Sequence, residues 1–445
     1  MQKFSAFLIS LFLWFAPGFA RAAVEIQHWT TPEGARVYFV PSDALPILDL
    51  QLDFAAGSAY DPADKASLAS FTRRLIDAGA GSLDEDAIAN RLADVGAQMG
   101  GGVDDDRASV SLRTLSSKTE RDGALDLLVT LMHEPTFPED VLVRERKRAV
   151  ADLQEALTQP DTIASRRFTQ AIYGDHPYGR LATEATIGAV GREDVVRFFR
   201  SHYTVDRMSI SLVGDVTRQE AEAIASRIAS GLPRSGGHDT IPPVALPAAA
   251  DIRVPHPSAQ AHVMIGMPGI TREDADYYPL LIGNYVLGGG GFVSRLMDEV
   301  REKRGFAYST YSYFAPQQQA GPFQIGLQTK GSQVSDALAV VDETVRTFIA
   351  DGPTEAELTA AKDYTINGFG LRLDSNRKVL GYVSVIGFYR LPLDWLEQYP
   401  KAVASLTVEA VRDAFQRRVK PDHMVRVVVG GDGDTAHAAA PPATQ

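Results

Sequence analysis

The sequence contains no cysteine among its 445 residues. Disulfide bonds, a cysteine nucleophile and a lipid-modified cysteine are therefore excluded. Stability must come from packed cores, and 445 residues are more than one core usually supports, so we expect two or more domains. The formal net charge of −12 argues against a general nucleic-acid binder, which would present a basic face.

Common catalytic motifs are also missing. The nine histidines are scattered, and no two are three or four residues apart, so no helix presents a histidine pair to a metal. There is no G-x-S-x-G motif of the kind that carries a serine nucleophile. The run LGGGGFVSRL at residues 287–296 lacks the Lys-Ser/Thr that completes a phosphate-binding loop. The sequence therefore shows no self-contained catalytic centre.

The first residues predict an export signal. Lys3 precedes an apolar run over residues 4–16, and Ala20-Arg21-Ala22 forms a small-residue cleavage site, so residues 1–22 resemble a secretory signal peptide. An anchoring helix is the alternative, but the apolar run is shorter than the ~20 residues that span a bilayer. We therefore expect a periplasmic protein without a stable membrane anchor. The low-complexity tail, residues 433–445, is expected to be disordered.

The rest of the chain divides into two halves. Residues 233–251 are rich in proline, glycine and alanine, which predicts a linker between an N-terminal domain (23–232) and a C-terminal domain (252–432). Each half places a strand before a helix, then further strands, long helices and a last strand. We therefore expect an α+β fold of two homologous α/β-sandwich domains produced by internal duplication. The expected strands are 35–40, 47–58, 108–116, 208–215, 262–269, 307–314, 322–330 and 424–431.

Four segments in register resemble the pitrilysin/insulinase family of zinc metallopeptidases, the inverted zincins. They are LDFAAGSAYDPADKASLASFTRRLIDAGA, FPEDVLVRERKRAVADLQEALTQPDT, FFRSHYTVDRMSISLVGDV and, in the second half, DADYYPLLIGNYVLGGGGFVSRLMDEVREKRGFAYSTYSYF. The chain length is similar to that of the short bacterial branch, which resembles mitochondrial processing peptidase. The resemblance implies two homologous domains of the metallopeptidase clamshell type, and it implies that short members pair as clamshells that enclose a chamber.

The resemblance also implies where zinc would bind in active members. Their motif His-x-x-Glu-His supplies two zinc ligands and a general base, and its positions match Ser70, Arg73 and Arg74 here. A further glutamate ligand of the family matches Asp152. Guanidinium groups stay protonated and offer no lone pair, so we expect no metal in this chain. We expect one of the two arginines to pair with Asp152, because a buried charge needs a partner; ordinary helix-surface residues are the alternative.

The second half keeps two residues that the family uses to hold substrate near the scissile bond. Arg301 and Tyr308 lie seven residues apart in VREKRGFAY, the register of the family motif, and Gly305 is placed to end a helix between them. Both are hydrogen-bond donors suited to a peptide carbonyl or an oxyanion. The family relationship also matches residues 54–61 to a substrate-binding edge strand.

A glycine run precedes this pair. Its members are Gly288, Gly289, Gly290 and Gly291, a possible substrate loop or a plain connector.

These expectations together predict a non-catalytic subunit of a heterodimeric zinc endopeptidase that is inactive alone. A catalytic partner of similar length would carry His-x-x-Glu-His and the zinc, while Arg301 and Tyr308 would complete its site for peptide substrates. The alternative from another class is a structural or assembly subunit with no role in proteolysis. A peptide-binding homodimer and an enzyme that uses another metal are further alternatives.

Overall fold

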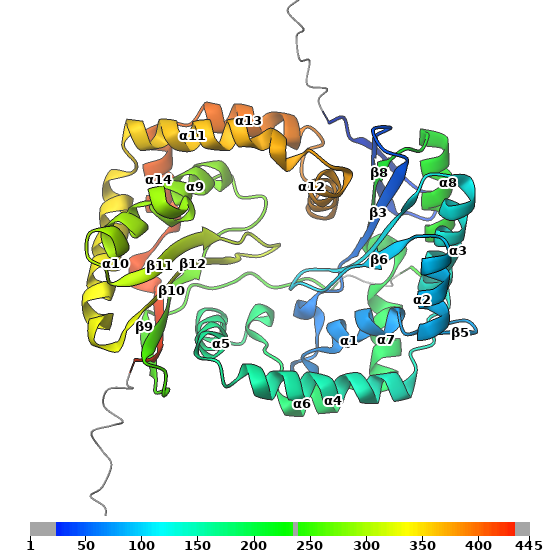
Figure 1. The fold of residues 1–445 in the computed structure, drawn as a ribbon, viewed down its shortest axis with the longest axis horizontal. Coiled ribbons are helices and arrows are strands. Elements are labelled where there is room, and N and C mark those ends of the chain that lie inside the picture. The colour runs from blue at the N-terminus through cyan, green and yellow to red at the C-terminus, as the bar shows by residue number, and fades with distance from the viewer. Residues whose placement is uncertain (1–23, 235–238, 432–445) are drawn as a thin grey trace, which may run out of the picture.

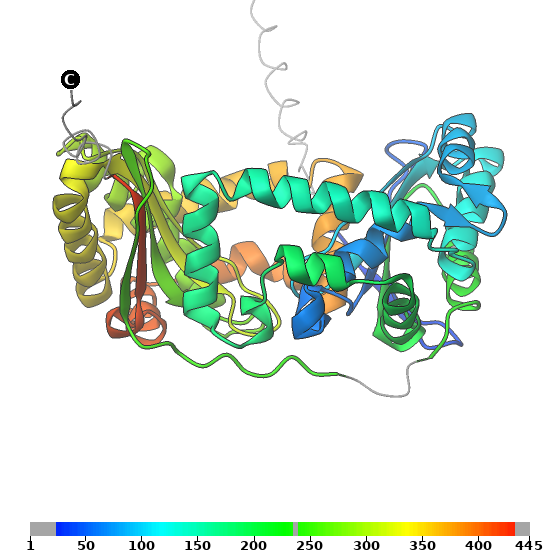
Figure 2. The same cartoon turned by 90° about the horizontal axis from the view of Figure 1, so that it is seen from below.

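The computed structural model describes residues 24–234 and 239–431. The predicted signal peptide and the predicted disordered tail lie outside the described residues. Two halves, each a β-sheet covered by helices, face each other across the molecule (Figure 1). In Figure 2, the long helix α4 (Glu139–Ala156) runs from the first half toward the second, and connector residues 239–249 pass along the opposite edge.

The first half contains a six-stranded sheet with strand order β1-β2-β8-β3-β7-β6. Its strands are β1 (Gln27–Thr30), β2 (Arg36–Pro41), β3 (Ile47–Phe54), β6 (Gln98–Gly100), β7 (Ala108–Leu115) and β8 (Met208–Gly214). Side chains of β7 alternate between buried and half-buried, as expected for a strand with one face on the core. A short hairpin, β4 (Gly79–Ala80) and β5 (Leu83–Asp84), follows the first helix.

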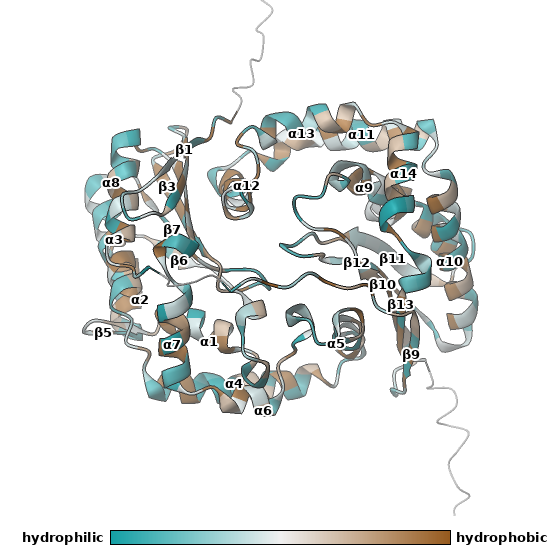
Figure 3. Cartoon of the chain, turned by 180° about the vertical axis from the view of Figure 1, so that it is seen from behind, coloured by the Kyte–Doolittle hydropathy of each residue, from teal (hydrophilic) through white to brown (hydrophobic). Residues whose placement is uncertain are grey.

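Eight helices belong to the first half of the described chain. They are α1 (Leu68–Ile76), α2 (Glu85–Asp94), α3 (Lys118–His133), α4, α5 (Pro160–Tyr173), α6 (Glu184–Ala189), α7 (Arg192–His202) and α8 (Arg218–Ala229). Most of these helices bury one stripe and expose the other. The mixture of teal and brown along α3 and α4 in Figure 3 reflects this amphipathic pattern.

The second half repeats the plan with a five-stranded sheet of order β11-β12-β10-β13-β9. Its strands are β9 (Ala250–Val254), β10 (Gln260–Pro268), β11 (Ala307–Phe314), β12 (Pro322–Lys330) and β13 (Val425–Gly430). Its helices are α9 (Tyr277–Asn284), α10 (Val334–Asp351), α11 (Glu355–Phe369), α12 (Asn376–Tyr389), α13 (Trp395–Ala404) and α14 (Val408–Arg418). The expected α+β class and the two similar domains are confirmed.

The two halves exchange a helix. Helix α5 follows α4 out of the first half, and Phe168 and Ile172 on it join a buried cluster with β13 of the second sheet (Figure 1). Helix α12 of the second half packs in return on β2, β3 and β8 of the first sheet. The approach is close, because a Cβ at Gly387 would lie 2.7 Å from the Tyr38 ring. One core therefore lies within the first half, whereas the core around α12 and the cluster around α5 combine residues from both halves.

A buried polar network anchors α12 to the first sheet. The Asp53 carboxylate of β3 is fully buried and accepts hydrogen bonds from Ser384 Oγ (2.7 Å) and Gln51 Nε2 (2.8 Å). Arg107 Nη1 lies 3.2 Å from the same carboxylate and donates to Ser384 Oγ at 2.8 Å. Burial raises the pKa of Asp53, and the positive charge of Arg107 opposes that rise.

One expectation about the first sheet is wrong. Residues 54–61 were expected to include an edge strand, but β3 ends at Phe54 and lies between β8 and β7 inside the sheet. The chain then leaves the sheet and forms a short 3₁₀ turn over Ser58–Tyr60. The edges of this sheet are β1 and β6.

Candidate functional site

Helix α1 carries the residues that match the metal motif. Its buried stripe includes Leu68, Phe71 and Leu75, as the helical spacing predicts. Its first turn is capped by Asp61, which is 2% exposed and accepts hydrogen bonds from the Ser67 and Ala69 amides. Burial raises the pKa of Asp61 to about 6, although these two amide donors oppose the shift.

Arg73 is a buried structural anchor. The residue is 6% exposed, and its guanidinium group reaches across to the last strands of the first sheet. Nη2 donates to the Gly100 carbonyl of β6 at 2.5 Å and Nε donates to the Ser109 carbonyl of β7 at 2.6 Å. Nη1 forms an ion pair with Asp77 at 2.8 Å. Arg73 therefore joins α1 to the sheet edge at β6.

Arg74 faces a different set of partners. Its side chain is 42% exposed and forms ion pairs with Glu85 of α2 (2.8 Å) and Glu145 of α4 (3.3 Å). Ser70, one turn earlier, is exposed to solvent.

The expected pairing of either arginine with Asp152 is wrong. The Asp152 side chain is 69% exposed, and its ion-pair partner is Arg148 of the same helix, at 3.8 Å. Because Glu145 and Asp152 lie two turns apart on one face of α4, the helical period cannot distinguish them. The structure selects Glu145, whose side chain is 12% exposed.

These residues do not fit a zinc ion. Zinc requires neutral imidazole, carboxylate or thiolate donors in a tetrahedral arrangement, whereas here two guanidinium groups occupy the place of a ligand and the base. The Glu145 and Asp77 carboxylates are already engaged by those arginines. Among residues 24–234 and 239–431, no three His, Asp or Glu side chains gather closely enough to hold a metal. The chain therefore has no catalytic zinc site of the family type.

Arg301 and Tyr308 are brought together by local structure. A π-helical segment, Met297–Glu302, carries Arg301, and Gly305 turns the chain with φ +66° before β11 begins at Ala307. The Arg301 guanidinium carbon lies 5.3 Å from the centroid of the Tyr308 ring and 4.9 Å from that of Phe292, both in cation–π range.

This cluster is open to solvent. Tyr308 is 85% exposed and Phe292 is 72% exposed, whereas the Arg301 side chain is 27% exposed beneath their rings. Among the described residues, the carboxylate that pairs with Arg301 is that of the neighbouring Glu302, at 3.3 Å. Phe292 was missed from the sequence. Its signal was an aromatic residue directly after four glycines, with no apolar partner at helical spacing before it.

The glycine run has a packing role. A Cβ at Gly288 would lie 2.3 Å from Ser312 Oγ of β11, and one at Gly290 would lie 2.7 Å from the Tyr285 carbonyl oxygen. Gly291 adopts φ +61°, which favours glycine. These constraints account for Gly288, Gly290 and Gly291 without a bound peptide, and the substrate role of the loop stays a prediction.

The two groups of residues lie in different halves of the chain. Ser70, Arg73 and Arg74 belong to α1 beside the first sheet, whereas Tyr308 lies on β11, the edge strand of the second sheet, and Arg301 lies on the π-helical segment before it (Figure 1).

Comparison with known proteins identifies the family. The model of the insulinase family, peptidase family M16, matches residues 42–185, and the model of the peptidase M16 inactive domain matches residues 189–364. The chain belongs to peptidase family M16. A crystal structure of a peptidase M16 inactive domain from Pseudomonas fluorescens is 37% identical, with a TM-score of 0.86, and the match covers 91% of this chain and 97% of that one.

Some similar proteins of this family are named as zinc proteases, and one is named as a non-peptidase homolog. The uncharacterized zinc protease YmxG of Bacillus subtilis is 24% identical over 360 residues, which cover 79% of this chain and 85% of that protein. The non-peptidase homolog YmxG of Helicobacter pylori is 23% identical over 432 residues, 95% of this chain and 98% of that protein. The arginines at the metal motif and the match to the inactive domain make this chain a non-catalytic M16 family member.

Proposed function

We propose that this chain is the non-catalytic subunit of a two-chain zinc endopeptidase, in which Arg301 and Tyr308 complete the active site of a catalytic M16 partner. The partner would be a chain of similar length that carries His-x-x-Glu-His and holds the zinc. The observation that supports this division is the contrast between the arginine-filled metal position on α1 and the solvent-exposed Arg301–Tyr308 pair.

The chemistry of the pair suits peptide hydrolysis. The guanidinium group and the phenol are donors that can bind the scissile carbonyl and the oxyanion that forms when water attacks it. Stacking of Arg301 between the Phe292 and Tyr308 rings restrains the long side chain, so less conformational entropy is lost when it binds. The zinc and the general base would belong to the partner.

The surrounding surface is consistent with an extended peptide or a partner chain. Strand β11 is an edge strand, with β12 on one side only. Its outer face presents Tyr311 (41% exposed) and Tyr313 (39% exposed), whose rings stack at 6.1 Å. Exposed aromatic side chains beside a free strand edge favour binding of peptide segments.

We further propose that the complex acts in the periplasm. The support is the signal-peptide pattern over residues 1–22. No helix in the described part of the chain has both the length and the apolar character needed to cross a bilayer.

The test reconstitutes the complex. The chain is co-purified with an exported M16 protein of the same genome that has an intact His-x-x-Glu-His, and hydrolysis of unfolded peptides is measured for wild type, Arg301→Ala and Tyr308→Phe. Loss of a transition-state donor lowers kcat by about 10²–10³-fold, so we expect kcat/KM to fall on that scale for Arg301→Ala. Arg304→Ala is the matched control. Arg304 lies three residues after Arg301, and its guanidinium group already forms an ion pair with Glu299.

Three results would contradict the proposal. Full activity of the Arg301→Ala complex would show that the guanidinium does not reach the substrate and would favour a structural or assembly subunit. Equal losses for Arg301→Ala and Arg304→Ala would show a general charge effect. A rise in KM with kcat unchanged would show that the guanidinium group contributes to ground-state peptide binding and not specifically to the transition state.

A further inference from the structure

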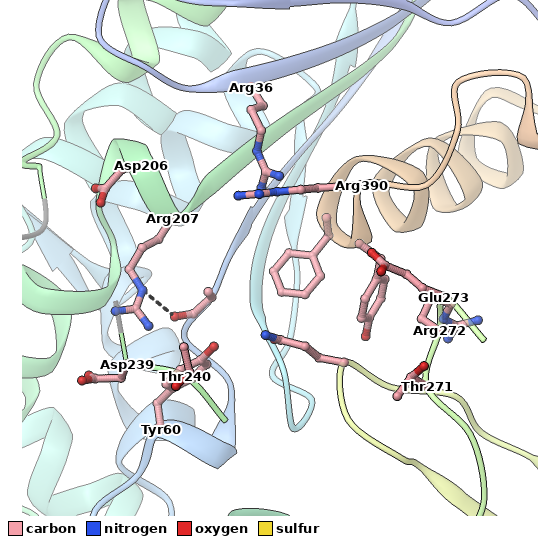
Figure 4. A pocket seen from close by; sticks show the side chains of 14 residues that line it. Arg36, Tyr60, Asp206, Arg207, Asp239, Thr240, Thr271, Arg272, Glu273 and Arg390 are labelled. Atoms are coloured by element: carbon pink, nitrogen blue, oxygen red, sulfur yellow. Dashed lines mark hydrogen bonds between the residues drawn. The ribbon is translucent and has the colours of Figure 1, made fainter. Parts of the chain in front are cut away.

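A cavity of about 420 Å³ lies where the two halves and the connector meet. Sequence patterns do not indicate this cavity, because its walls come from segments far apart in the chain. Figure 4 shows the side chains that line it. They are Arg36, Ala55, Tyr60, Asp206, Arg207, Asp239, Thr240, Thr271, Arg272, Glu273, Gln318, Phe388, Tyr389 and Arg390.

Four of the lining residues are arginines, two from each half. Arg36 begins β2 and Arg207 precedes β8 in the first half. Arg272 lies in the loop after β10, and Arg390 directly follows α12 in the second half. The cavity is therefore a place where cationic side chains of both halves converge.

Arg36 and Arg390 repel each other. The pKa of Arg36 is lowered below its usual value, first by burial and then by the positive charge of Arg390. Their guanidinium groups lie side by side in Figure 4. Arg36 Nη1 is buried and has no hydrogen-bond partner among the described residues. A bound anion would satisfy this donor and neutralise the repulsion.

The other two arginines are held in place by aromatic rings. Arg207 lies 4.9 Å from the centroid of the Tyr60 ring, and its Nε donates to the Ala55 carbonyl at 3.2 Å. Arg272 lies 5.2 Å from the centroid of the Tyr389 ring, and its buried Nε lacks a hydrogen-bond partner within the described chain. These side chains are preorganised around the cavity.

Carboxylates in the wall offset the charge of the four arginines only in part. Asp206, Asp239 and Glu273 also line the cavity, but no salt bridge joins any of the four guanidinium groups to a carboxylate of the described residues. Asp239 lies 3.8 Å from His202 instead, and its side chain is 80% exposed. Four cations against three anions leave a positive excess around the cavity.

The backbone conformation at Arg390 is one that glycine usually adopts, so the presence of an arginine there suggests a role for its side chain. The residue ends α12 in the left-handed conformation, with φ +56°, and the Leu391 amide donates to the Ile386 carbonyl as in a glycine-type helix cap. Glycine is the usual residue at such a position, because a Cβ is disfavoured there. An arginine kept at this site is consistent with a functional use of its guanidinium.

We propose that this cavity binds a small, multiply charged oxyanion that bridges the two halves. Guanidinium groups match the geometry of phosphate and carboxylate oxygens and bind them through paired hydrogen bonds. The volume of about 420 Å³ lies within the range typical of small-molecule sites. Phosphate and polycarboxylate ligands share this chemistry, and because Arg36 and Arg390 come from different halves, the bound anion holds the halves together. This site is separate from Arg301 and Tyr308.

The test measures thermal unfolding of the mature full-length chain. Inorganic pyrophosphate and citrate are the two probes, each compared with sodium chloride and acetate at equal ionic strength. Binding to the native state raises the unfolding midpoint in a saturable manner. We expect such a rise with pyrophosphate, with citrate or with both, and isothermal titration calorimetry gives the affinity. The preferred probe tells whether the site favours phosphates or carboxylates.

Arg390→Gly is the decisive variant. Glycine adopts the left-handed conformation freely, so without anion the midpoint stays the same or rises. Loss of one charged donor weakens binding by about tenfold or more, and Arg36→Gln weakens it comparably. Arg304→Ala, which removes a positive charge outside the cavity, leaves the affinity unchanged. Equal stabilisation of wild type and Arg390→Gly, or a rise that chloride reproduces, would overturn the proposal.

Discussion

Replacement of Arg73 by methionine tests whether the residue that matches the general-base position of the family motif is a structural anchor. Methionine keeps the apolar stem but removes the donors to the Gly100 and Ser109 carbonyls and to Asp77. Removal of one partner from a buried ion pair costs about 3–5 kcal/mol. Because the Asp77 side chain is 32% exposed and water can reach it, we expect the lower end, about 3 kcal/mol.

Arg74→Met is the matched control on the next residue of the same helix. Its two ion pairs involve a side chain that is 42% exposed, and surface pairs contribute about 0.2–1 kcal/mol each. The free energy of unfolding is measured for both variants by urea denaturation followed by far-ultraviolet circular dichroism. A loss for Arg73→Met no larger than that for Arg74→Met would refute the reasoning that burial and carbonyl partners make Arg73 the anchor.

Three further predictions follow from the described contacts. Ser384→Ala removes a buried donor to Asp53, and urea unfolding is expected to show a loss of about 1–3 kcal/mol; a change below about 0.5 kcal/mol would contradict the proposed anchoring of α12. Burial, and next the charge of Arg207, lowers the pKa of His202 from 6.5 to about 4. As the pH falls, the His202 imidazole is therefore protonated at a higher pH in the unfolded chain than in the folded chain. The free energy of unfolding falls as the pH drops from 6.5 toward 4, by roughly 3 kcal/mol. This loss is absent in His202→Gln, and parallel pH profiles of the two proteins would disprove it. Zinc titrated calorimetrically into the chelator-treated chain should show no stoichiometric binding; an equimolar, saturable isotherm would overturn the conclusion drawn from the donor set.

Much of the fold follows from local patterns in the sequence. The expected strands 307–314 and 322–330 have the bounds found for β11 and β12, because alternation and flanking glycine and proline mark both ends. The short strands β1, β6 and β9 were missed, since three to five residues carry too little periodicity. The helix exchange was also missed, because an amphipathic stripe indicates that a helix packs but not which sheet it covers.

In the candidate site too, local features could be predicted from the sequence, whereas contacts between distant segments could not. Arg301 and Tyr308 are joined by a helix end, one glycine and a strand start, all of which are local, so the spacing alone indicated their proximity. The partner of Arg74 depends on how α4 is rotated against α1, and the sequence offered two acidic residues two turns apart. The arginine cavity lies at the other extreme, because its walls become neighbours only when both halves and the connector are assembled.

Arg73 and Arg301 differ in what they contribute to the stability of this chain. That difference favours a role for Arg301 in contacts outside the chain. Arg73 has three partners inside its own half, so its retention is explained by stability alone. Arg301 contacts Phe292, Tyr308 and its sequence neighbour, and the two rings are mostly exposed. Exposed apolar side chains scattered singly are ordinary, but Phe292 and Tyr308 gathered around one cation form a patch of the kind that marks interaction sites. Since little folding energy depends on Arg301, its replacement by alanine should leave the free energy of unfolding, measured by urea denaturation, within about 0.5 kcal/mol of wild type. A loss of peptidase activity in the reconstituted complex would then be attributable to contact with the partner's substrate and not to unfolding.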